Sequence, residues 1–142
     1  MKTNVEYLAG LFDGEGCITI RKQRDISAKR GYTYALLVDV SQKRSAVLFE
    51  YKTRWGGSIG KGKRCDRWQV YSSKAKYALK DLAPYLIVKR EEAIIAIEFQ
   101  DYKDSFSNMG STGISDFTFE KYHTAYRKLQ ELKREHCVQA VH

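Results

Sequence analysis

Two carboxylates, Asp13 and Glu15, stand at the end of a segment whose apolar spacing predicts a short helix over residues 4–13. At this end of a helix a carboxylate is disfavoured by roughly 0.3–1 kcal/mol, because the helix dipole is negative there. Gly10 and Gly14 are four residues apart and remove the side chains from one helix face, so a second copy of the helix can approach closely. Such pairing would crowd four carboxylates together, an arrangement that repels itself unless cations occupy it. The residues therefore predict a divalent metal site shared by two copies of the chain, suited to Mg²⁺ bound by one or two carboxylates and a substrate phosphate.

The nine residues 8–16, LAGLFDGEG, resemble the LAGLIDADG motif of homing endonucleases, with six identities and with Phe12, Gly14 and Glu15 as the departures. A single copy of the motif implies a homodimer that makes a staggered double-strand break in DNA at a long, near-palindromic site. The resemblance implies that Glu15 and Gly14 hold Mg²⁺, with Mn²⁺ as an alternative ion. It also implies a dimer interface formed by Tyr7, Gly10, Leu11, Asp13 and Gly14.

Two later segments resemble the same family. Val40-Ser41-Gln42-Lys43 is similar to the family segment that closes the second strand, which implies that Gln42 orients the attacking water. Pro84-Tyr85-Leu86-Ile87-Val88-Lys89 is similar to the family's Pro…Leu…Lys run, which implies that Lys89 stabilises charge at the cleavage site. Lys89 also stands at a predicted helix N-terminus, where a cation opposes the dipole. The chain departs from some relatives at Ala46, where they carry a basic residue.

The elements that must position these residues alternate between helical and strand periodicity. A capping box of Thr3 and Glu6 opens the first helix, and Asp116 caps the last. After the first helix, the pattern predicts strands over 18–23 and 32–42 and a helix over 45–55. A hairpin follows, with strands over 59–63 and 67–71 that turn at 64–66. The remaining elements are three helices: one capped by Ser73 and ended by Pro84, one over 89–102 and one over 116–135. We expect residues 1–142 to form a single α+β domain. The order α-β-β-α-β-β-α predicts an antiparallel sheet covered by helices on one face, and the family resemblance implies a saddle-like sheet.

Alternation along the strands predicts which side chains face the helices. Ile18 and Ile20 should be buried, as should Trp68 and Val70. The opposite face should then present polar side chains to DNA: Thr19, Arg21, Gln23, Thr33, Asp39, Arg67 and Gln69, together with Lys61 and Lys63, whose facing the pattern leaves ambiguous. Arg and Gln are the side chains that read guanine and adenine in the major groove. Leu37 falls on this face too, an awkward place for leucine.

The charge of the chain is localised. Residues 20–64 carry a net charge of +9 and the rest of the chain −1, although the whole chain is only +8. A basic excess on one segment of strands and turns indicates a polyanionic partner, and it favours double-stranded DNA over a membrane surface.

Other classes of function are excluded by missing features. No run of residues is long and apolar enough to cross a membrane. Residues 57–63 read G-x-x-x-x-G-K, but Arg64 replaces the Ser or Thr of a phosphate-binding loop, so we expect no nucleotide cofactor. Three unpaired cysteines and the absence of a secretory leader favour an intracellular protein of the cytoplasm, nucleoid or an organelle matrix. Two alternatives stay open: an RNA-binding maturase that assists intron splicing, and a non-cleaving DNA-binding regulator of the same fold.

Overall fold

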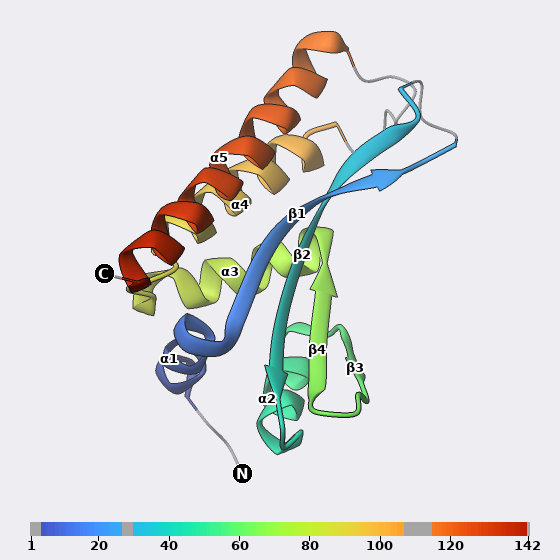
Figure 1. Cartoon of the computed structure of the whole chain (residues 1–142). Coiled ribbons are helices and arrows are strands. Elements are labelled where there is room, and N and C mark those ends of the chain that lie inside the picture. Colours follow the sequence, from blue (N-terminus) through green and yellow to red (C-terminus); the bar gives the residue numbers. More distant parts are fainter. Residues whose placement is uncertain (1–3, 27–29, 107–114, 142) are drawn as a thin grey trace.

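The computed structural model describes residues 4–26, 30–106 and 115–141, with side chains up to residue 135. Its elements follow in the order α1 (Val5–Glu15), β1 (Gly16–Arg24), β2 (Tyr32–Gln42), α2 (Ala46–Trp55), β3 (Ser58–Gly60), β4 (Asp66–Tyr71), α3 (Ser72–Leu82), the short 3-10 turn η1 (Ala83–Tyr85), α4 (Arg90–Asp104) and α5 (Asp116–Val141). The four strands form one antiparallel sheet in the order β1-β2-β4-β3, and β1 and β2 are long and strongly twisted (Figure 1). The predicted α+β fold, with αββαββα order and helices on one face of a curved antiparallel sheet, is confirmed.

The two faces of the sheet differ as the alternation predicts. Ile18 and Val38 pair across β1 and β2, Val38 pairs in turn with Val70, and all are buried beneath the helices. Trp68 is also fully buried, and its indole Nε1 donates a 2.8 Å hydrogen bond to the Gly56 carbonyl. Burial of this apolar face holds the helices on one side and leaves the polar face free.

The turn from α2 into the hairpin depends on glycine. Gly57 has a φ of +87°, and a Cβ at this position would lie 2.3 Å from the Gln69 carbonyl oxygen. Any side chain would therefore force the hairpin away from α2.

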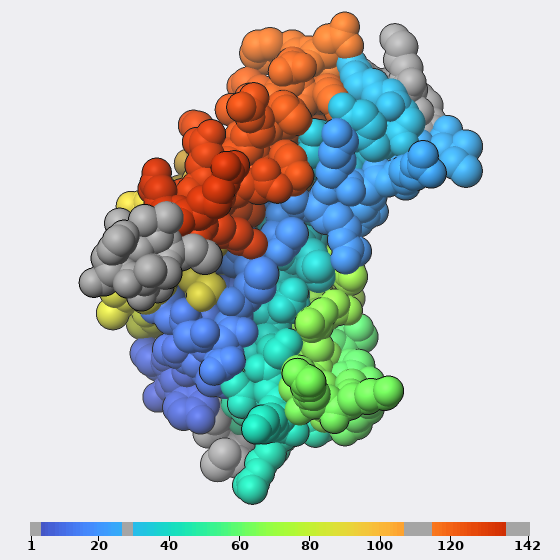
Figure 2. All heavy atoms as spheres, viewed as in Figure 1, coloured from blue at the N-terminus to red at the C-terminus, as the bar shows by residue number. Residues whose placement is uncertain are grey.

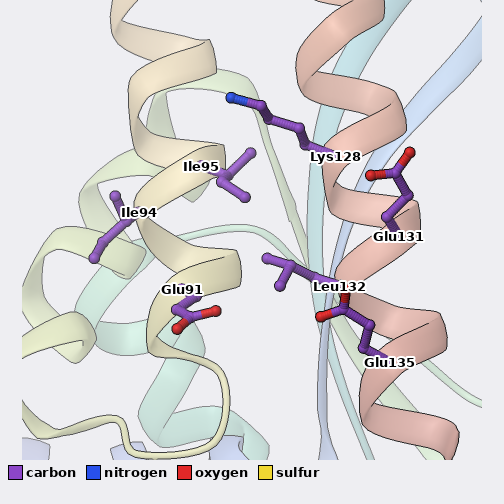
Figure 3. A pocket seen from close by; sticks show the side chains of 7 residues that line it. All are labelled: Glu91, Ile94, Ile95, Lys128, Glu131, Leu132 and Glu135. Atoms are coloured by element: carbon purple, nitrogen blue, oxygen red, sulfur yellow. The ribbon is translucent and has the colours of Figure 1, made fainter.

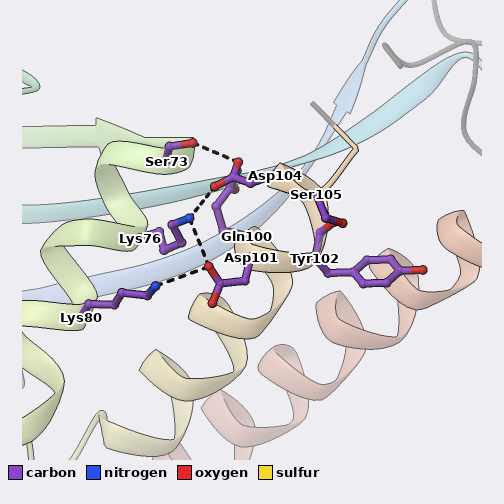
Figure 4. A network of polar contacts seen from close by, with 8 residues as sticks. All are labelled: Ser73, Lys76, Lys80, Gln100, Asp101, Tyr102, Asp104 and Ser105. Atoms are coloured by element: carbon purple, nitrogen blue, oxygen red, sulfur yellow. Dashed lines mark hydrogen bonds and ion pairs between the residues drawn. The ribbon is translucent and has the colours of Figure 1, made fainter. Parts of the chain in front are cut away.

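A polar network fastens α3 to α4 (Figure 4). The buried ammonium of Lys76 lies 2.6 Å from Asp104 Oδ2 and 3.1 Å from Asp101 Oδ1. Asp104 also accepts hydrogen bonds from Gln100 Nε2 at 2.8 Å and from Ser73 Oγ at 2.9 Å. The sequence prediction that Ser73 caps α3 is therefore wrong: α3 begins at Ser72, and the Ser73 hydroxyl bonds to α4 instead.

The N-terminal part of α5 is held by aromatic contacts with β2. The Tyr34 hydroxyl lies 2.5 Å from His123 Nδ1, and the Tyr34 ring lies within 5.6 Å of the Phe119 and Tyr126 rings. Burial raises the pKa of Tyr34 to about 12, so its hydroxyl keeps its proton. This cluster fixes the start of the last helix against the sheet.

Other local predictions need correction. Asn4 caps α1, where its side chain accepts from the Tyr7 N–H at 2.8 Å; Thr3 lies outside the described residues. The Ser115 hydroxyl accepts from the Thr118 N–H at the start of α5, so Asp116 is not the cap. In α4, predicted over 89–102 and observed over 90–104, the buried positions include Ala93 and Phe99, whereas Ile94 is 46% exposed.

Candidate active site and DNA-binding face

The end of α1 is shaped by close packing around Gly16. This residue is extended, and its N–H bonds to the Phe12 carbonyl as the cap of α1. A Cβ at Gly16 would lie 2.4 Å from the buried ring of Phe12, so only glycine permits this passage from helix to strand. The same packing fixes Glu15, the last residue of α1, at the start of β1.

Asp13 joins α1 to the segment that leads into α4. Its carboxylate accepts hydrogen bonds from the backbone N–H groups of Ile87 at 2.8 Å, Val88 at 3.2 Å and Lys89 at 3.0 Å. Three successive N–H groups before a helix form a favourable site for an anion. The Asp13 carboxylate is therefore fully hydrogen-bonded within the chain, whereas the Glu15 carboxylate has no such bonds in the part of the chain that the structure describes.

Lys89 approaches α1 from the other side of the same junction. Its Nζ donates a 2.7 Å hydrogen bond to the Asp13 carbonyl oxygen, at the negative end of α1. The cost of a lysine at the start of α4 is thus offset by the dipole of α1. The structure brings the Lys89 ammonium within two residues of Glu15.

Glu15 is exposed, and its side chain makes no hydrogen bond or ion pair with the part of the chain that the structure describes. Among these residues no group of three or more His, Cys, Asp or Glu side chains could hold a metal ion. The free carboxylate of Glu15 and the exposed backbone of Gly14 are hard oxygen donors, the chemistry that Mg²⁺ prefers. One chain offers a single carboxylate here, so these donors fit part of a divalent metal site.

Gln42 lies at the same end of the sheet. Gly16 pairs with Val40, and Gln42 stands two residues further along β2, opposite the end of α1. Gln42 is half-buried and its backbone pairs with Asp66 of β4, but its side chain makes no hydrogen bond in the part of the chain that the structure describes, so the side-chain amide is available to a ligand. Ala46 is exposed at the first turn of α2 and places no charge there.

The polar face of the sheet is open in the view of Figure 2, where β1 and β2 run between α5 and the β3–β4 hairpin. The register puts seven of the predicted DNA-contacting side chains on it: Thr19, Arg21, Gln23, Thr33, Asp39, Arg67 and Gln69. Arg21 and Arg67 are exposed, and Arg67 Nε donates to Ser41 Oγ at 3.2 Å. Leu37 is only 5% exposed despite facing this side, between Thr19 and Tyr71 in the register.

Asp39 is the acidic exception on this face. Burial raises the pKa of its carboxyl, while the positive charges of Arg67 and Lys133 act to lower it. A carboxylate among cations can accept a hydrogen bond from a cytosine amino group in the major groove.

Lys61 and Lys63 do not lie on a strand. The hairpin pairs Gly60 with Arg67, so β3 ends at Gly60 and both lysines belong to the exposed loop before Asp66. The sequence prediction of a strand over 59–63 is wrong here: β3 covers only Ser58–Gly60, and the loop that follows carries a 3.1 Å ion pair between Lys61 and Asp66.

The predicted dimer surface of α1 is open in the monomer. A Cβ added at Gly10 or Gly14 would meet no atom within 4 Å, and Tyr7 is 57% exposed beside them. Ile87 and Val88 are exposed too, at 84% and 55%, and Asp13 holds them against the end of α1. The sequence analysis did not assign these two residues to the dimer surface. They could have been noticed as two successive apolar side chains that precede the predicted helix over 89–102 and belong to no predicted helix or strand.

A hollow between α4 and α5 lies apart from this site (Figure 3). It is lined by Ile94, Ile95, Leu132 and Lys128, and by the three acids Glu91, Glu131 and Glu135. An acidic lining repels a polyanion, so this hollow does not belong to a nucleic-acid surface. No helix in the described part of the chain is long and apolar enough to cross a membrane.

Residues 8–106 match the family model described as LAGLIDADG endonuclease. The chain therefore belongs to the LAGLIDADG endonuclease family. No curated protein matches the chain by sequence.

Solved structures of homing endonucleases share the fold. I-CvuI, in complex with its target in the presence of Ca, superposes with a TM-score of 0.76 at 19% identity, over 90% of this chain and 80% of that one. I-TnaI superposes with a TM-score of 0.72 at 17% identity, over 94% of this chain and 96% of that one. The archaeal intron-encoded I-Vdi141I, complexed with DNA, gives 0.76 at 17% identity, over 90% and 82% of the two chains.

Proposed function

We propose that this protein is a site-specific DNA endonuclease that makes a staggered break in both strands of a long, near-palindromic duplex. The observation that carries this is the free carboxylate of Glu15, at the end of α1, two residues after Asp13, whose carbonyl oxygen holds the Lys89 ammonium, and at the border of the open basic sheet face. Family membership and the DNA-bound structures of I-CvuI and I-Vdi141I support it.

The active form is a homodimer. The open face of α1 around Gly10 and Gly14, continued by exposed Ile87 and Val88, offers a self-complementary surface where two helices can meet. Two copies would bring two Glu15 carboxylates and two Gly14 carbonyls to the symmetry axis, and so complete the donor set that one chain lacks.

Divalent Mg²⁺, held by Glu15 and the Gly14 carbonyl, would supply charge stabilisation at the scissile phosphate. Gln42 would orient the attacking water through its free amide. Lys89, anchored to the end of α1, would stabilise the negative charge that develops on the phosphate as the bond breaks. Asp13 positions Lys89 by holding its backbone.

The sheet sets the length of the target. Strands β1 and β2 have nine and eleven residues, so each spans about 30–37 Å, or roughly nine to eleven base pairs. Two sheets related by a two-fold axis would cover a site of about 20 base pairs, read mainly from Arg21, Gln23, Arg67 and Gln69.

Replacement of Glu15 by Gln tests the proposal. The shape is kept and a negative charge next to DNA is removed, so we expect a duplex selected from a random library to bind as well or more tightly in EDTA. Cleavage of that duplex in Mg²⁺ should fall by at least about a thousandfold, because the metal loses its protein carboxylate. Glu6→Gln, an exposed glutamate at the other end of α1, is the matched control and should cut normally. Full cleavage by Glu15→Gln would remove Glu15 from the site, and preferential binding of RNA by the native protein would favour a maturase.

A further inference from the structure

Lys133, on the last helix, reaches the polar face of the sheet. Helix α5 contacts both β1 and β2, and from its C-terminal half Lys133 Nζ lies 3.4 Å from Thr19 Oγ1 and 3.5 Å from Cys17 Sγ. Cys17 and Thr19 alternate with buried Ile18, so both point to the open face. A residue of the helical layer thus places its charge on the side of the sheet that the helices leave free.

The ammonium of Lys133 has no anionic partner in the described part of the chain. No carboxylate there lies within the 4.0 Å of an ion pair with it. Asp39 is paired with Cys17 in the sheet, and the positive charge of Lys133 acts to lower the pKa of its carboxyl. The charge of Arg67 acts on Asp39 in the same direction. A thiol and a hydroxyl are weak partners for three N–H donors, so the group keeps capacity for an external anion.

The position of this charge is close to the proposed site of cutting. Cys17 follows Glu15 by two residues, across Gly16 at the start of β1. At the other side of the site Ala46 leaves the first turn of α2 without a basic side chain. The Lys133 ammonium on α5 would therefore lie beside the DNA backbone, near the phosphates that the proposed function places at Glu15.

We infer that Lys133 binds a DNA phosphate next to the cleaved position in each half-site, which makes α5 part of the DNA interface. This inference rests on the proposed function, because it requires DNA on the open face. It assigns Lys133 to positioning of the backbone, whereas base reading stays with the strands.

The test measures how DNA affinity depends on salt. Lys133→Met keeps the alkyl stem and removes the charge; the probe is a 30-base-pair duplex selected by the native protein from a random library in Ca²⁺. Two lost phosphate contacts per dimer should make the slope of log affinity against log salt shallower by roughly 1.8, and raise Kd by roughly 10- to 60-fold at 0.1 M salt. Lys133→Arg should restore both values. Lys128→Met is the control, because Lys128 is on the same helix but lines the hollow facing α4 (Figure 3).

Neutralising single phosphates locates the contact. Methylphosphonates placed one at a time along the duplex should weaken the native protein at a phosphate next to the cut and leave Lys133→Met unaffected there. The inference would be overturned by an unchanged salt slope in Lys133→Met, or by an equal loss of affinity in both proteins at every methylphosphonate. In either case, specific binding of the duplex by the native protein would leave the proposed function standing. Failure of the native protein to select any duplex would overturn both.

Discussion

Asp13 and Glu15 are neighbours in the motif, yet the fold gives them opposite surroundings. The Asp13 carboxylate accepts hydrogen bonds from three backbone N–H groups of residues 87–89, whereas the Glu15 side chain has no partner in the described part of the chain. One carboxylate therefore stabilises the junction and the other stays available to a cation. An acid that is already satisfied within the chain is a poor metal ligand.

Asp13→Asn should weaken this junction. The amide can accept hydrogen bonds at one atom only, and its NH₂ group would face N–H donors, so we expect the free energy of unfolding to fall by about 1–3 kcal/mol. Urea unfolding followed by circular dichroism measures this. Glu6→Gln, the same type of change at an exposed position of α1, should stay within about 0.5 kcal/mol of the native protein. If the two variants unfold alike, the hydrogen bonds to Asp13 contribute little.

Among the elements, α3 and α4 are held together by charge as well as by apolar contact. Burial alone would raise the pKa of Asp104, but hydrogen bonds from Lys76, Gln100 and Ser73 outweigh it and hold the pKa below its usual range. The hydrogen bond to Asp104 likewise raises the pKa of Lys76. Both groups are therefore charged across the neutral range, and their contribution to stability depends on Asp104 staying ionised.

Lys76→Met should show this dependence on pH. Near pH 7 the variant leaves Asp104 without its counter-charge and should lose about 1–3 kcal/mol of unfolding free energy. The lowered pKa of Asp104 means that its contribution is complete above the unfolded value of about 3.9 and disappears as the pH falls through the folded value. The difference between native and variant should therefore shrink below about pH 4 in thermal melts. Lys80→Met, which breaks only an exposed 3.5 Å pair with Asp101, should change stability by less than about 0.5 kcal/mol at any pH.

Periodicity predicted the strand at 32–42 with its observed bounds, because the β-branched alternation there agrees with burial. It failed where a distant residue competes for a local group. Ser73 reads as a cap, but Asp104, 31 positions away, takes its hydroxyl. The motif at 8–16 indicated Glu15, and the run at 84–89 indicated Lys89. No pattern within a helix could reveal that Lys133 reaches β1, since this depends on how α5 crosses the sheet.

At the scale of the whole molecule, the open face of α1 is the surface that a second copy would cover. Gly10→Leu should fold at least as well as the native protein, because a side chain there meets nothing and leucine favours a helix by about 0.5–1 kcal/mol over glycine. In the proposed dimer the same side chain would hold the two helices apart. Sedimentation at micromolar concentration should give about 16 kDa for this variant and about twice that for the native protein.

Gly60→Leu provides the control for that experiment. Gly60 is also exposed and open, but it lies on β3, far along the sheet from α1 in Figure 1. The control should remain a dimer. A native protein that sediments as a monomer both free and on DNA would contradict the dimer.

The placement of α5 also bears on solubility. β1 and β3 are the two edges of the sheet, and an exposed edge invites pairing with strands of other molecules. β3 has only three residues, too few to template much pairing, but β1 has nine. Helix α5 contacts this longer edge strand, and Lys133 extends over it. The helix and the charge of Lys133 therefore oppose strand-to-strand pairing at this edge of the sheet.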